Sequence, residues 1–339
     1  MTATNVPARE RLAALVEQFA GKRILVVGDL IADEYVYGEI ARVSREAPVM
    51  ILRYESTTTV PGGAGNAAAN AAALGGHVTI AGVVGRDRSG RQVVRALKDR
   101  GVDVSGLVGE RARPTPTKTR LLAGLAHSLR QQVIRIDNEP AAAFPQGVLE
   151  RLAGIVEVGA GSADAIVISD YNYGVADGPV VNAVRSAAST RGIPVVVDSR
   201  LRLAQFAGFT SATPNEVELE VFASVTLDSD ASVAAEAEAA LRALDLDALL
   251  VTRGSRGMAL AERGCESRLM PTVGSAPAID VTGAGDTVIA TYALGLAAGA
   301  SFAEAAHIAN HAGGLVVMKR GTATVTRDEL ARSVESAGA

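Results

Sequence analysis

The 339-residue chain has no tryptophan, a single cysteine and only 4% aromatic residues. With one cysteine, Cys265, it can form neither an internal disulfide nor a cysteine-based zinc site, and such usage suits a reducing, cytoplasmic compartment. The 33 basic and 37 acidic residues give a net charge of −4, without a long run of either sign. A basic surface that would coat nucleic acid is therefore not expected.

A membrane-spanning segment and a signal peptide are also lacking. One charge-free stretch, residues 56–85, is long enough to cross a bilayer, but its proline, asparagines and many glycines make it too weakly apolar for lipid. The N-terminus has no charged-then-apolar signal pattern, and the apolar residues of 12–19 recur at helical spacing. Hydrophobic residues make up 48% of the chain and charged residues 21%, so we expect a globular protein without a membrane partner.

Short runs rich in valine and isoleucine alternate with alanine-rich segments of helical periodicity. The predicted strands are 23–29, 77–85, 164–170, 193–198 and 247–254, and the predicted helices are about 62–75, 88–100, 145–159, 177–190, 229–243, 283–299 and 301–319. This alternation is typical of βαβ units. The sequence therefore predicts an α/β protein in which helices cover both faces of a parallel sheet.

Two segments interrupt this alternation. Residues 35–55 and 115–137 alternate polar with apolar side chains and contain turn-like breaks, which predicts two antiparallel hairpins. We expect the hairpins to form a β lid on a body made of residues 1–34, 56–114 and 138–339. A small sheet must cover its apolar face with the site it closes over or with another copy. A homodimer formed through the lid is therefore expected.

Glycine is abundant, with 35 residues, and one group of glycines begins a helix. Residues 280–287, Asp-Val-Thr-Gly-Ala-Gly-Asp-Thr, run directly into an apolar helical segment. Small residues at a helix N-terminus leave backbone N–H groups free to bind an anion such as phosphate. Asp286 in that first turn is a candidate base for phosphoryl transfer. A plain helix start, with Thr282 as N-cap and Asp286 as a favourable first-turn acid, explains the same residues equally well.

A second glycine group, Pro61-Gly62-Gly63-Ala64-Gly65-Asn66, opens an alanine-rich helix. It contains Gly63-x-Gly65-x-x-Ala68, which has the form of a dinucleotide-binding fingerprint, but no Val/Ile-rich strand leads directly into it. Tight helix packing is the simpler explanation of this group taken alone. After the first strand the chain has acidic residues, including Asp33, which suit sugar hydroxyls better than a pyrophosphate.

Two polar segments in the second half follow predicted strands, where ligands of such sheets bind. They are Thr-Pro-Asn-Glu-Val-Glu at 213–218 and Thr-Arg-Gly-Ser-Arg-Gly at 252–257. The P-loop pattern is absent, so ATP must be held in another way. Asn215 and Glu218, one helical turn apart, could organise water around Mg²⁺, although solvated helix-start residues explain them as well.

Taken together, the motifs resemble the ribokinase-like (PfkB) family of carbohydrate kinases from about Arg23 to Val325. Residues 62–66 are similar to the first family signature, residues 82–90 to the strand and turn that follow it, and residues 280–286 to the second signature. The resemblance implies a three-layer α/β/α ribokinase-like fold with a mostly parallel central sheet and a small β-sheet lid. It also implies an ATP- and Mg²⁺-dependent kinase that phosphorylates a hydroxyl of a sugar or sugar phosphate.

The resemblance also implies roles for individual residues. Asp286 corresponds to the catalytic base, and Gly283, Ala284 and Gly285 correspond to the anion hole. The residues that bind the sugar would be Asp33, Gly62, Gly63 and Asn66. Those on the ATP side would be Asn215, Glu218, Thr252, Gly254, Gly257 and Asn310, with Glu218 reaching Mg²⁺ through water. Asp280, Thr282 and the backbone near Gly321 resemble a monovalent-cation site, which implies activation by K⁺.

Within the family the lid segments are most similar to kinases of heptose 7-phosphate, the branch that feeds ADP-heptose synthesis. The similar segments are 42–49, 117–120 and 130–137. By this likeness the residues that grip a substrate phosphate would be Lys118, Arg120, Arg130, Gln132 and Arg135. Ion pairs on the surface or between lids are the competing explanation for the charged members.

The chain departs from those kinases at two places that are expected to face the site. Tyr173 stands where they usually have lysine, and Asp198-Ser199-Arg200 replaces Asp-Pro-Lys. These departures leave open the identity of the sugar, including another sugar or a nucleoside. The His-x-Gly-His motif of the nucleotidyltransferase domain that is fused to some relatives is absent, so a stand-alone kinase is expected. Two other readings remain: a nicotinamide-dependent oxidoreductase and a non-catalytic sugar sensor.

Overall fold

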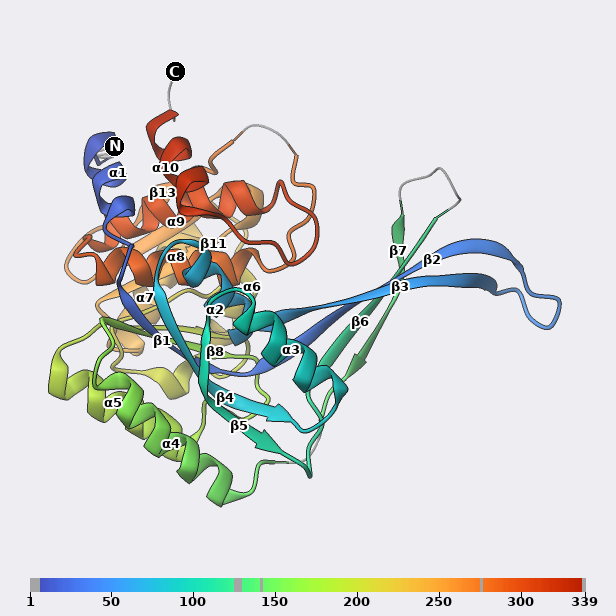
Figure 1. Ribbon diagram of the computed structural model, residues 1–339. Helices are drawn as coiled ribbons and strands as arrows, with labels where there is room; N and C mark the ends of the chain where they lie inside the picture. Colours follow the sequence, from blue (N-terminus) through green and yellow to red (C-terminus); the bar gives the residue numbers. More distant parts are fainter. Residues whose placement is uncertain (1–6, 125–129, 141–142, 275–276, 337–339) are drawn as a thin grey trace.

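Two β-sheets organise the chain in the computed structural model, which describes residues 7–124, 130–140, 143–274 and 277–336. The larger sheet has nine strands and forms the body, and the smaller has four strands and projects from it (Figure 1). Residues 125–129 of the second predicted hairpin lie outside the described residues. Within the described residues, no helix is long and apolar enough to cross a membrane.

The nine strands of the body all point in the same direction except the strand Met258–Glu262, which pairs antiparallel with both of its neighbours. In spatial order they are β13 (Arg268–Met270), β12 (Met258–Glu262), β11 (Ala248–Thr252), β10 (Ser211–Ala212), β9 (Val195–Ser199), β8 (Ala165–Asp170), β1 (Arg23–Gly28), β4 (His77–Gly85) and β5 (Asp103–Glu110). Central strands such as β1 and β8 are buried on both faces, which is why they read as unbroken aliphatic runs in the sequence.

Helices cover both faces of this sheet and create two separate cores. One face carries α1 (Arg9–Glu17), α2 (Ala64–Ala73), α3 (Arg88–Lys98), α8 (Ala284–Ala297), α9 (Phe302–Val316) and α10 (Arg327–Ser336). The other carries α4 (Gln146–Ala160), α5 (Gly178–Arg191), α6 (Glu216–Ala223) and α7 (Asp230–Ala243). Alternate residues of each strand enter opposite cores: Ile24 and Val26 pack with the first set, and Leu25 and Val27 with the second.

The predicted three-layer α/β/α fold is therefore confirmed, and the predicted helices match described ones within a few residues. Four strands, β5, β10, β12 and β13, and two helices, α6 and α10, were not predicted. The missed strands β10 and β13 have only two and three residues. Helix α6 has only eight residues, and α10 buries only Leu330 and Val334, so each offers few apolar positions from which a helix could be predicted.

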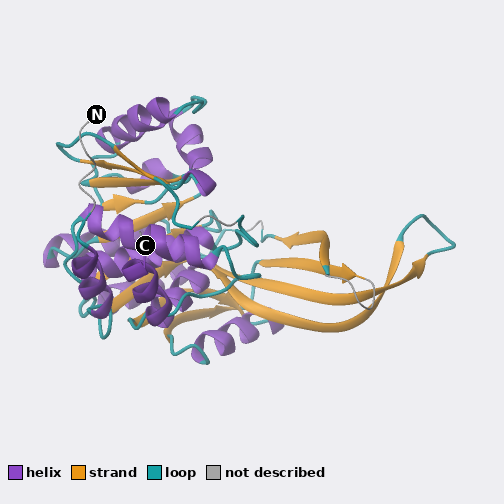
Figure 2. Ribbon diagram, turned by 90° about the horizontal axis from the view of Figure 1, so that it is seen from above, coloured by secondary structure: helices purple, strands orange, loops and turns teal. Residues whose placement is uncertain are grey.

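The smaller sheet consists of two antiparallel hairpins joined side by side through a parallel pair. Its order is β3 (Met50–Gly63), β2 (Leu30–Val43), β6 (Thr117–Gly124) and β7 (Gln131–Asn138). We refer to these four strands as the lid. Strands β2 and β3 have 14 residues each and reach from the body to the far end of the projection (Figure 2). Both extend past the predicted segment 35–55 and into the body.

The register of the lid separates its two faces by chemistry. Asp33 lies opposite Lys118, and Tyr35 lies opposite Arg120, so these polar side chains share one face. Arg135 and Asp137 of β7 continue that face, because they pair with Arg120 and Lys118. We call this the inner face. The outer face carries the intervening positions, which include Val36, Leu121, Ile134 and Ile136.

Candidate active site

The first turn of α8 contacts Asn66, which lies 220 positions earlier in the sequence. Gly283 precedes the helix with a φ of 77°, in the left-handed region that glycine favours. Asn66, in the first turn of α2, donates a 2.8 Å hydrogen bond from Nδ2 to Asp286 Oδ2. The hydroxyl of Tyr171 donates to the other oxygen, Asp286 Oδ1, at 3.0 Å. Both oxygens of this carboxylate are therefore oriented by protein donors.

Asp286 is buried, with only 5% of its surface exposed. Burial raises its pKa to about 7, although the hydrogen bonds from Asn66 and Tyr171 act in the opposite direction. The side chains behind it are also fixed: Asn70 Nδ2 donates to Asn66 Oδ1 at 3.1 Å, and Thr287 Oγ1 donates to Asn70 Oδ1 at 3.0 Å. A carboxylate with this pKa, held in one orientation, is suited to accept a proton near neutral pH.

The two glycines before Asp286, Gly283 and Gly285, have different surroundings. A Cβ on Gly283 would lie 2.4 Å from Asn66 Nδ2, so a side chain there would displace the amide that orients Asp286. A Cβ on Gly285 would meet no atom within 4 Å. The space above Gly285 is therefore open beside the N-terminal N–H groups of α8, where an anion is favoured. The structure places Gly283, Ala284 and Gly285 as the sequence predicted, without testing their role.

Tyr171 belongs to a loop that follows β8 and is anchored by a buried aspartate. Asp29, directly after β1, accepts hydrogen bonds from the backbone N–H groups of Tyr171, Tyr173 and Val175 at 2.9, 2.9 and 3.1 Å. Burial raises the pKa of Asp29 to about 6, even though these N–H groups favour its charged form. The anchored loop gives Tyr171 a fixed backbone from which its hydroxyl reaches Asp286.

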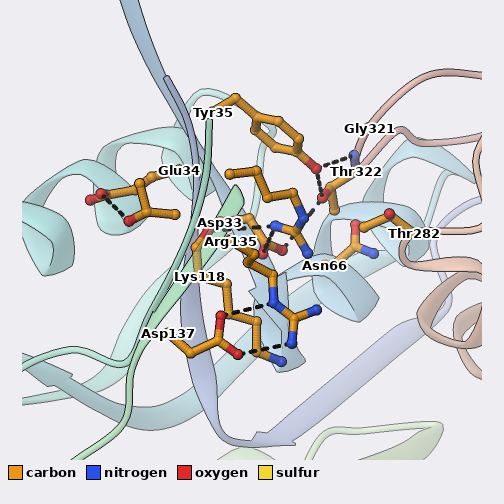
Figure 3. Close-up of polar contacts among 12 residues, drawn as sticks. Asp33, Glu34, Tyr35, Asn66, Lys118, Arg135, Asp137, Thr282, Gly321 and Thr322 are labelled. Carbon is orange, nitrogen blue, oxygen red and sulfur yellow. Dashed lines mark hydrogen bonds and ion pairs between the residues drawn. The ribbon is translucent and has the colours of Figure 1, made fainter. Parts of the chain in front are cut away.

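The inner face of the lid brings several predicted substrate-binding residues to the same place (Figure 3). Asp33 accepts a 2.6 Å hydrogen bond from Arg120 in a buried ion pair, and Thr322 Oγ1 donates to its other oxygen at 3.4 Å. Gly62 lies against the same carboxylate, because a Cβ there would be 2.3 Å from Asp33 Oδ2. Tyr35 Oη lies 3.0 Å from Thr322 Oγ1 and so ties the lid to the C-terminal part of the body.

The cations predicted to grip a phosphate do not all have the same surroundings. Arg130 pairs with Glu55, and Arg135 pairs with Asp137. Ion pairs on the lid therefore explain both arginines without a bound phosphate. Gln132 is exposed on β7. Lys118 differs, since only 8% of its surface is exposed and no carboxylate of the described residues lies within ion-pair distance of its ammonium group. Its Nζ lies 5.1 Å from the centre of the Tyr171 ring.

A groove of about 560 Å³ lies along the second half of the body sheet and contains most of the predicted nucleotide-binding residues. Asn215, Glu218, Thr252 and Gly254 line it, together with Arg200. Asn215 and Glu218 form a capping box at the start of α6, in which each side chain accepts a hydrogen bond from the backbone N–H of the other. The helix-start explanation given for these two residues therefore holds, whatever else they bind.

Gly257 and Asn310 are not among the described residues that line this groove. A Cβ on Gly257 would lie 2.0 Å from the carbonyl oxygen of Met270, and its φ is 84°, so packing of β12 against β13 accounts for the glycine. Asn310 Nδ2 donates to the carbonyl oxygen of Pro271 at 2.7 Å. Both residues have a structural role next to the groove.

Asp198, at the carboxyl end of β9, adds a second carboxylate beside Glu218. Burial raises the pKa of both groups, and the nearby charge of Glu218 raises that of Asp198 further. The carboxylate of Asp198 accepts no hydrogen bond from the described residues. Mg²⁺ is commonly held by one or two carboxylates together with waters and substrate phosphates, so this pair fits it. No set of three or more potential ligand side chains occurs among the described residues.

Asp280, one of the residues of the predicted cation site, is bonded to the backbone of Thr282 and of Gly321. Asp280 accepts N–H groups from Thr282 at 2.9 Å and from Gly321 at 2.8 Å. Burial alone would raise the pKa of Asp280, but these hydrogen bonds outweigh it and the pKa lies below its usual value. The contacts also explain the arrangement as a tie between two loops.

The two departures from the heptose-kinase pattern occupy different environments. Tyr173 faces the lid side and donates a 2.6 Å hydrogen bond to Glu139, just beyond β7. Ser199 is buried and faces inward, where its hydroxyl donates to Asp170 at 2.7 Å. Within the tripeptide 198–200, which was expected to face the site, Ser199 therefore points away from it. Arg200 faces the site in its place, because it lines the groove and its Cζ lies 5.2 Å from the centre of the Tyr171 ring.

Sequence analysis did not single out Asp29 or Tyr171, and it named Asp198 and Arg200 only within a tripeptide expected to face the site. A signal for Asp29 and Asp198 was present. Asp29, Asp170 and Asp198 each end or follow a predicted aliphatic strand, and the carboxyl ends of parallel strands meet at one edge of a sheet. The dinucleotide reading of Gly63-x-Gly65 loses its basis, because the strand that leads into α2 is the lid strand β3, paired antiparallel with β2.

Comparison with known proteins agrees with this geometry. Residues 22–329 match the family described as pfkB family carbohydrate kinase. The chain is 41% identical over 331 residues to the bifunctional protein HldE of Citrifermentans bemidjiense, covering 96% of this chain and 66% of that protein. It is 40% identical over 307 residues to HldE of Gluconacetobacter diazotrophicus, covering 90% and 62%. The chain thus spans slightly less than two thirds of the length of these relatives.

Solved structures with low sequence identity have the same fold. Phosphofructokinase-2 of Escherichia coli in complex with potassium superposes with a TM-score of 0.77 at 21% identity, covering 93% of this chain and 98% of that one. Ribokinase of Arabidopsis thaliana complexed with ribose and ATP gives a TM-score of 0.71 at 22% identity, covering 93% and 99%. At these identities the likeness establishes the fold alone.

Proposed function

The chain belongs to the pfkB family of carbohydrate kinases, and we propose that it transfers the γ-phosphoryl group of ATP to a hydroxyl of a heptose 7-phosphate or a related sugar phosphate. The observation that carries the proposal is the position of Asp286. This buried carboxylate with a pKa of about 7 begins α8 and is held by Asn66 and Tyr171. The HldE relatives, about 40% identical over at least 90% of the chain, support the heptose branch.

In the proposed reaction Asp286 accepts the proton of the attacking hydroxyl. The N–H groups from Gly283 to Gly285 would then face the phosphoryl group, in the open space beside Gly285. The N–H of Ala284 donates to the carbonyl oxygen of Val281 at 3.2 Å and would have to exchange that bond for the phosphoryl oxygen. Asn66 and Tyr171 keep the carboxylate oriented while the proton moves. These residues supply positioning and electrostatic stabilisation, which are the main protein contributions to phosphoryl transfer.

We propose that the sugar lies under the inner face of the lid. Asp33 and Gly62 would face its hydroxyls, with Gly63 and Asn66 completing the floor. Of the lid residues predicted to grip the sugar phosphate, Lys118 is the best placed, since it is buried and has no carboxylate partner of its own among the described residues. Arg120, Arg130 and Arg135 already have carboxylate partners. They would have to share their charge with a substrate phosphate.

We place ATP in the groove lined by Asn215, Glu218, Thr252 and Gly254. Mg²⁺ would be held by the phosphates of ATP, by Asp198 and, through water, by Glu218. It would offset the negative charge of the ATP phosphates. Activation by K⁺ at Asp280 and Thr282 is a further part of the proposal, and a solved neighbour of the same fold is a potassium complex. Because a kinase needs ATP, a cytoplasmic location is proposed as well.

We also propose a homodimer formed through the lid. The outer face exposes Ile134 and Ile136 by 50% and 53%, beside Val36 and Leu121. Exposed apolar side chains on a four-stranded sheet with two free edges favour burial against a second copy. The inner face is turned toward the site, so a partner on the outer face would leave the site accessible.

A screen of ATP consumption tests the kinase proposal. The purified chain would be assayed with Mg²⁺ and K⁺ against heptose 7-phosphate, heptoses, hexose phosphates, pentoses and nucleosides, with Asp286→Asn as the matched control. ADP formation that depends on heptose 7-phosphate and is lost in the control supports the proposal. Turnover of a different acceptor would reassign the substrate. Binding of sugars without any ADP formation would instead favour the sugar-sensing alternative.

A further inference from the structure

Arg200 lies between the groove and the proposed base. It follows β9 directly, and its backbone is fixed by a 3.1 Å hydrogen bond from its N–H to the carbonyl oxygen of Asp170. The side chain lines the groove with Asn215 and Glu218. Its guanidinium also lies 5.2 Å from the ring of Tyr171, whose hydroxyl bonds Asp286. The side chain of Arg200 therefore extends from the groove to the ring of Tyr171, and Tyr171 in turn contacts Asp286.

Arg200 forms no ion pair within the described residues, although its charge acts to lower the raised pKa values of the nearby Asp198 and Glu218. Arg202, two residues later, donates to both oxygens of Asp170 at 2.6 and 3.2 Å, and Arg253 pairs with Glu216 and Asp230. Arg200 has no such partner: among the described residues, no carboxylate lies within 4 Å of its guanidinium. An arginine fixed in a site without a carboxylate partner can offer its planar donors to an anion.

A second cation converges on the same ring from the lid. Lys118 Nζ lies 5.1 Å from the centre of Tyr171, on a buried side chain that is likewise without a carboxylate partner in the described part of the chain. Burial and the like charge of Arg200 lower the pKa of Lys118. Two cations that repel each other beside Asp286 are stabilised when an anion binds between them. Neither cation has a carboxylate at ion-pair distance within the described residues, so both can offer hydrogen-bond donors to a bound anion.

We propose that Arg200 is a further catalytic residue, which contacts the phosphoryl group as it passes from the nucleotide to the acceptor. The inference rests on the proposed kinase reaction and adds a residue to it. The bond between the γ-phosphorus and the bridging oxygen breaks, and its electron pair leaves on ADP. The acceptor oxygen forms the new bond to phosphorus, and its proton goes to Asp286. Arg200 stays protonated and offsets the charge on the non-bridging oxygens.

The shape of the arginine side chain fits the proposal. Arginine presents a planar fork that can contact two phosphate oxygens at once, and lysine presents a single charged point. Arg200→Lys should accordingly keep part of the rate, and Arg200→Ala should keep far less.

Chemical rescue tests a direct role. With the acceptor found in the ADP screen, Arg200→Ala should lower kcat about 100- to 1,000-fold, the range for loss of one transition-state donor, while KM for ATP changes less than about threefold. Because Arg200 is exposed, free guanidinium at millimolar concentration can enter the space left by the side chain. It should raise the kcat of Arg200→Ala at least about tenfold. Arg95→Ala, an exposed arginine of α3 outside the site, should show neither loss nor rescue.

The outcomes separate the two levels of the proposal. If the wild-type chain phosphorylates no sugar, the proposed function fails before Arg200 is considered. If the wild type is active and Arg200→Ala keeps more than about a third of kcat, Arg200 does not contact the phosphoryl group. A rate loss without rescue, accompanied by an equal rise in KM for ATP, would assign Arg200 to nucleotide binding and also overturn the proposal. Rescue that Arg95→Ala does not show supports it.

Discussion

The side-chain amide of Asn66 donates a 2.8 Å hydrogen bond to Asp286 Oδ2, across 220 positions of sequence. The contact joins the first turns of α2 and α8, the two helices that open with glycine-rich segments. One glycine group thus provides the carboxylate and the other provides the amide that orients it. Each group looked ordinary when taken alone, and their meeting makes the arrangement specific.

Removing this amide should change the pH dependence of the reaction. Asp286 works as a base only when ionised, so the rate should rise with pH through a midpoint near 7. The hydrogen bond from Asn66 favours the ionised form, and Asn66→Ala should therefore move the midpoint upward, by roughly one pH unit. The pH profile of kcat/KM measures this shift, because it reports the pKa values of the free enzyme. Tyr171→Phe removes the other donor and should move the midpoint in the same direction, and an unchanged midpoint in both variants would contradict the role of Asp286 as the base.

Asp286→Asn should lower turnover about 100- to 10,000-fold, the usual contribution of a positioned proton acceptor, and leave ATP affinity nearly unchanged. Steady-state kinetics and calorimetric titration with ATP separate the two effects. Wild-type turnover in this variant would exclude Asp286 as the base.

The same substitution should change stability in a pH-dependent way. The pKa of Asp286 is higher in the folded chain than its ordinary value of 3.8, so its contribution to stability is fully present below about pH 4 and is lost as pH rises through about 7. At pH 8 the variant should be more stable than the wild type, by on the order of 2–4 kcal/mol of unfolding free energy, and the difference should vanish near pH 4. Denaturant unfolding at the two pH values measures it, and an equal difference at both would show that ionisation is not its cause.

Two neighbouring glycines should respond to alanine in opposite ways. At Gly283 a Cβ would collide with Asn66 and the backbone φ is 77°, so Gly283→Ala should lower the unfolding free energy by about 1–3 kcal/mol. At Gly285 the Cβ would meet open space, so Gly285→Ala should unfold like the wild type and yet lose activity, because the methyl group occupies the position proposed for the phosphoryl group. Thermal unfolding and turnover of both variants provide the test. Equal melting temperatures for the two would contradict the packing argument.

Charge on the outer face of the lid should disrupt the proposed dimer. Ile134→Glu combined with Ile136→Glu would place two carboxylates in the expected contact. Light scattering should give a dimer for the wild type and a monomer for the double variant. Val158→Glu, at an exposed apolar residue of α4 far from the lid, is the matched control and should remain dimeric. A monomeric wild type would remove the proposal.

Much of the body could be predicted because parallel strands buried on both faces leave an unmistakable aliphatic pattern. The short strands β10 and β13 could not be predicted, since two or three residues have no period. In the lid, the polar alternation identified the hairpins. It could not show that β2 and β6 run parallel, because the hydrogen-bonding partners of a strand are not encoded in its own alternation.

The site could be predicted only where a motif is local. Asp286 and its glycines are consecutive and were found, and so was Asn66. Arg200 and Tyr171 lie far apart in the sequence and become neighbours only through the edge of the sheet. The glycine at 257 was assigned to the nucleotide, whereas the approach of Met270 to its Cα accounts for it. A pattern of residue types cannot distinguish a glycine that makes room for a ligand from one that makes room for another strand.

Strands β2 and β3 continue without interruption from the body to the far end of the lid, and Asp33, Gly62 and Gly63 sit at their base. The lid is therefore no accessory module that could be trimmed away or exchanged between relatives. Any cut that shortens it near the body removes part of the substrate floor. Within the β2–β3 hairpin, variation in length should be tolerated at the distant turn between Val43 and Met50, so lids of different reach can evolve there while the floor stays constant.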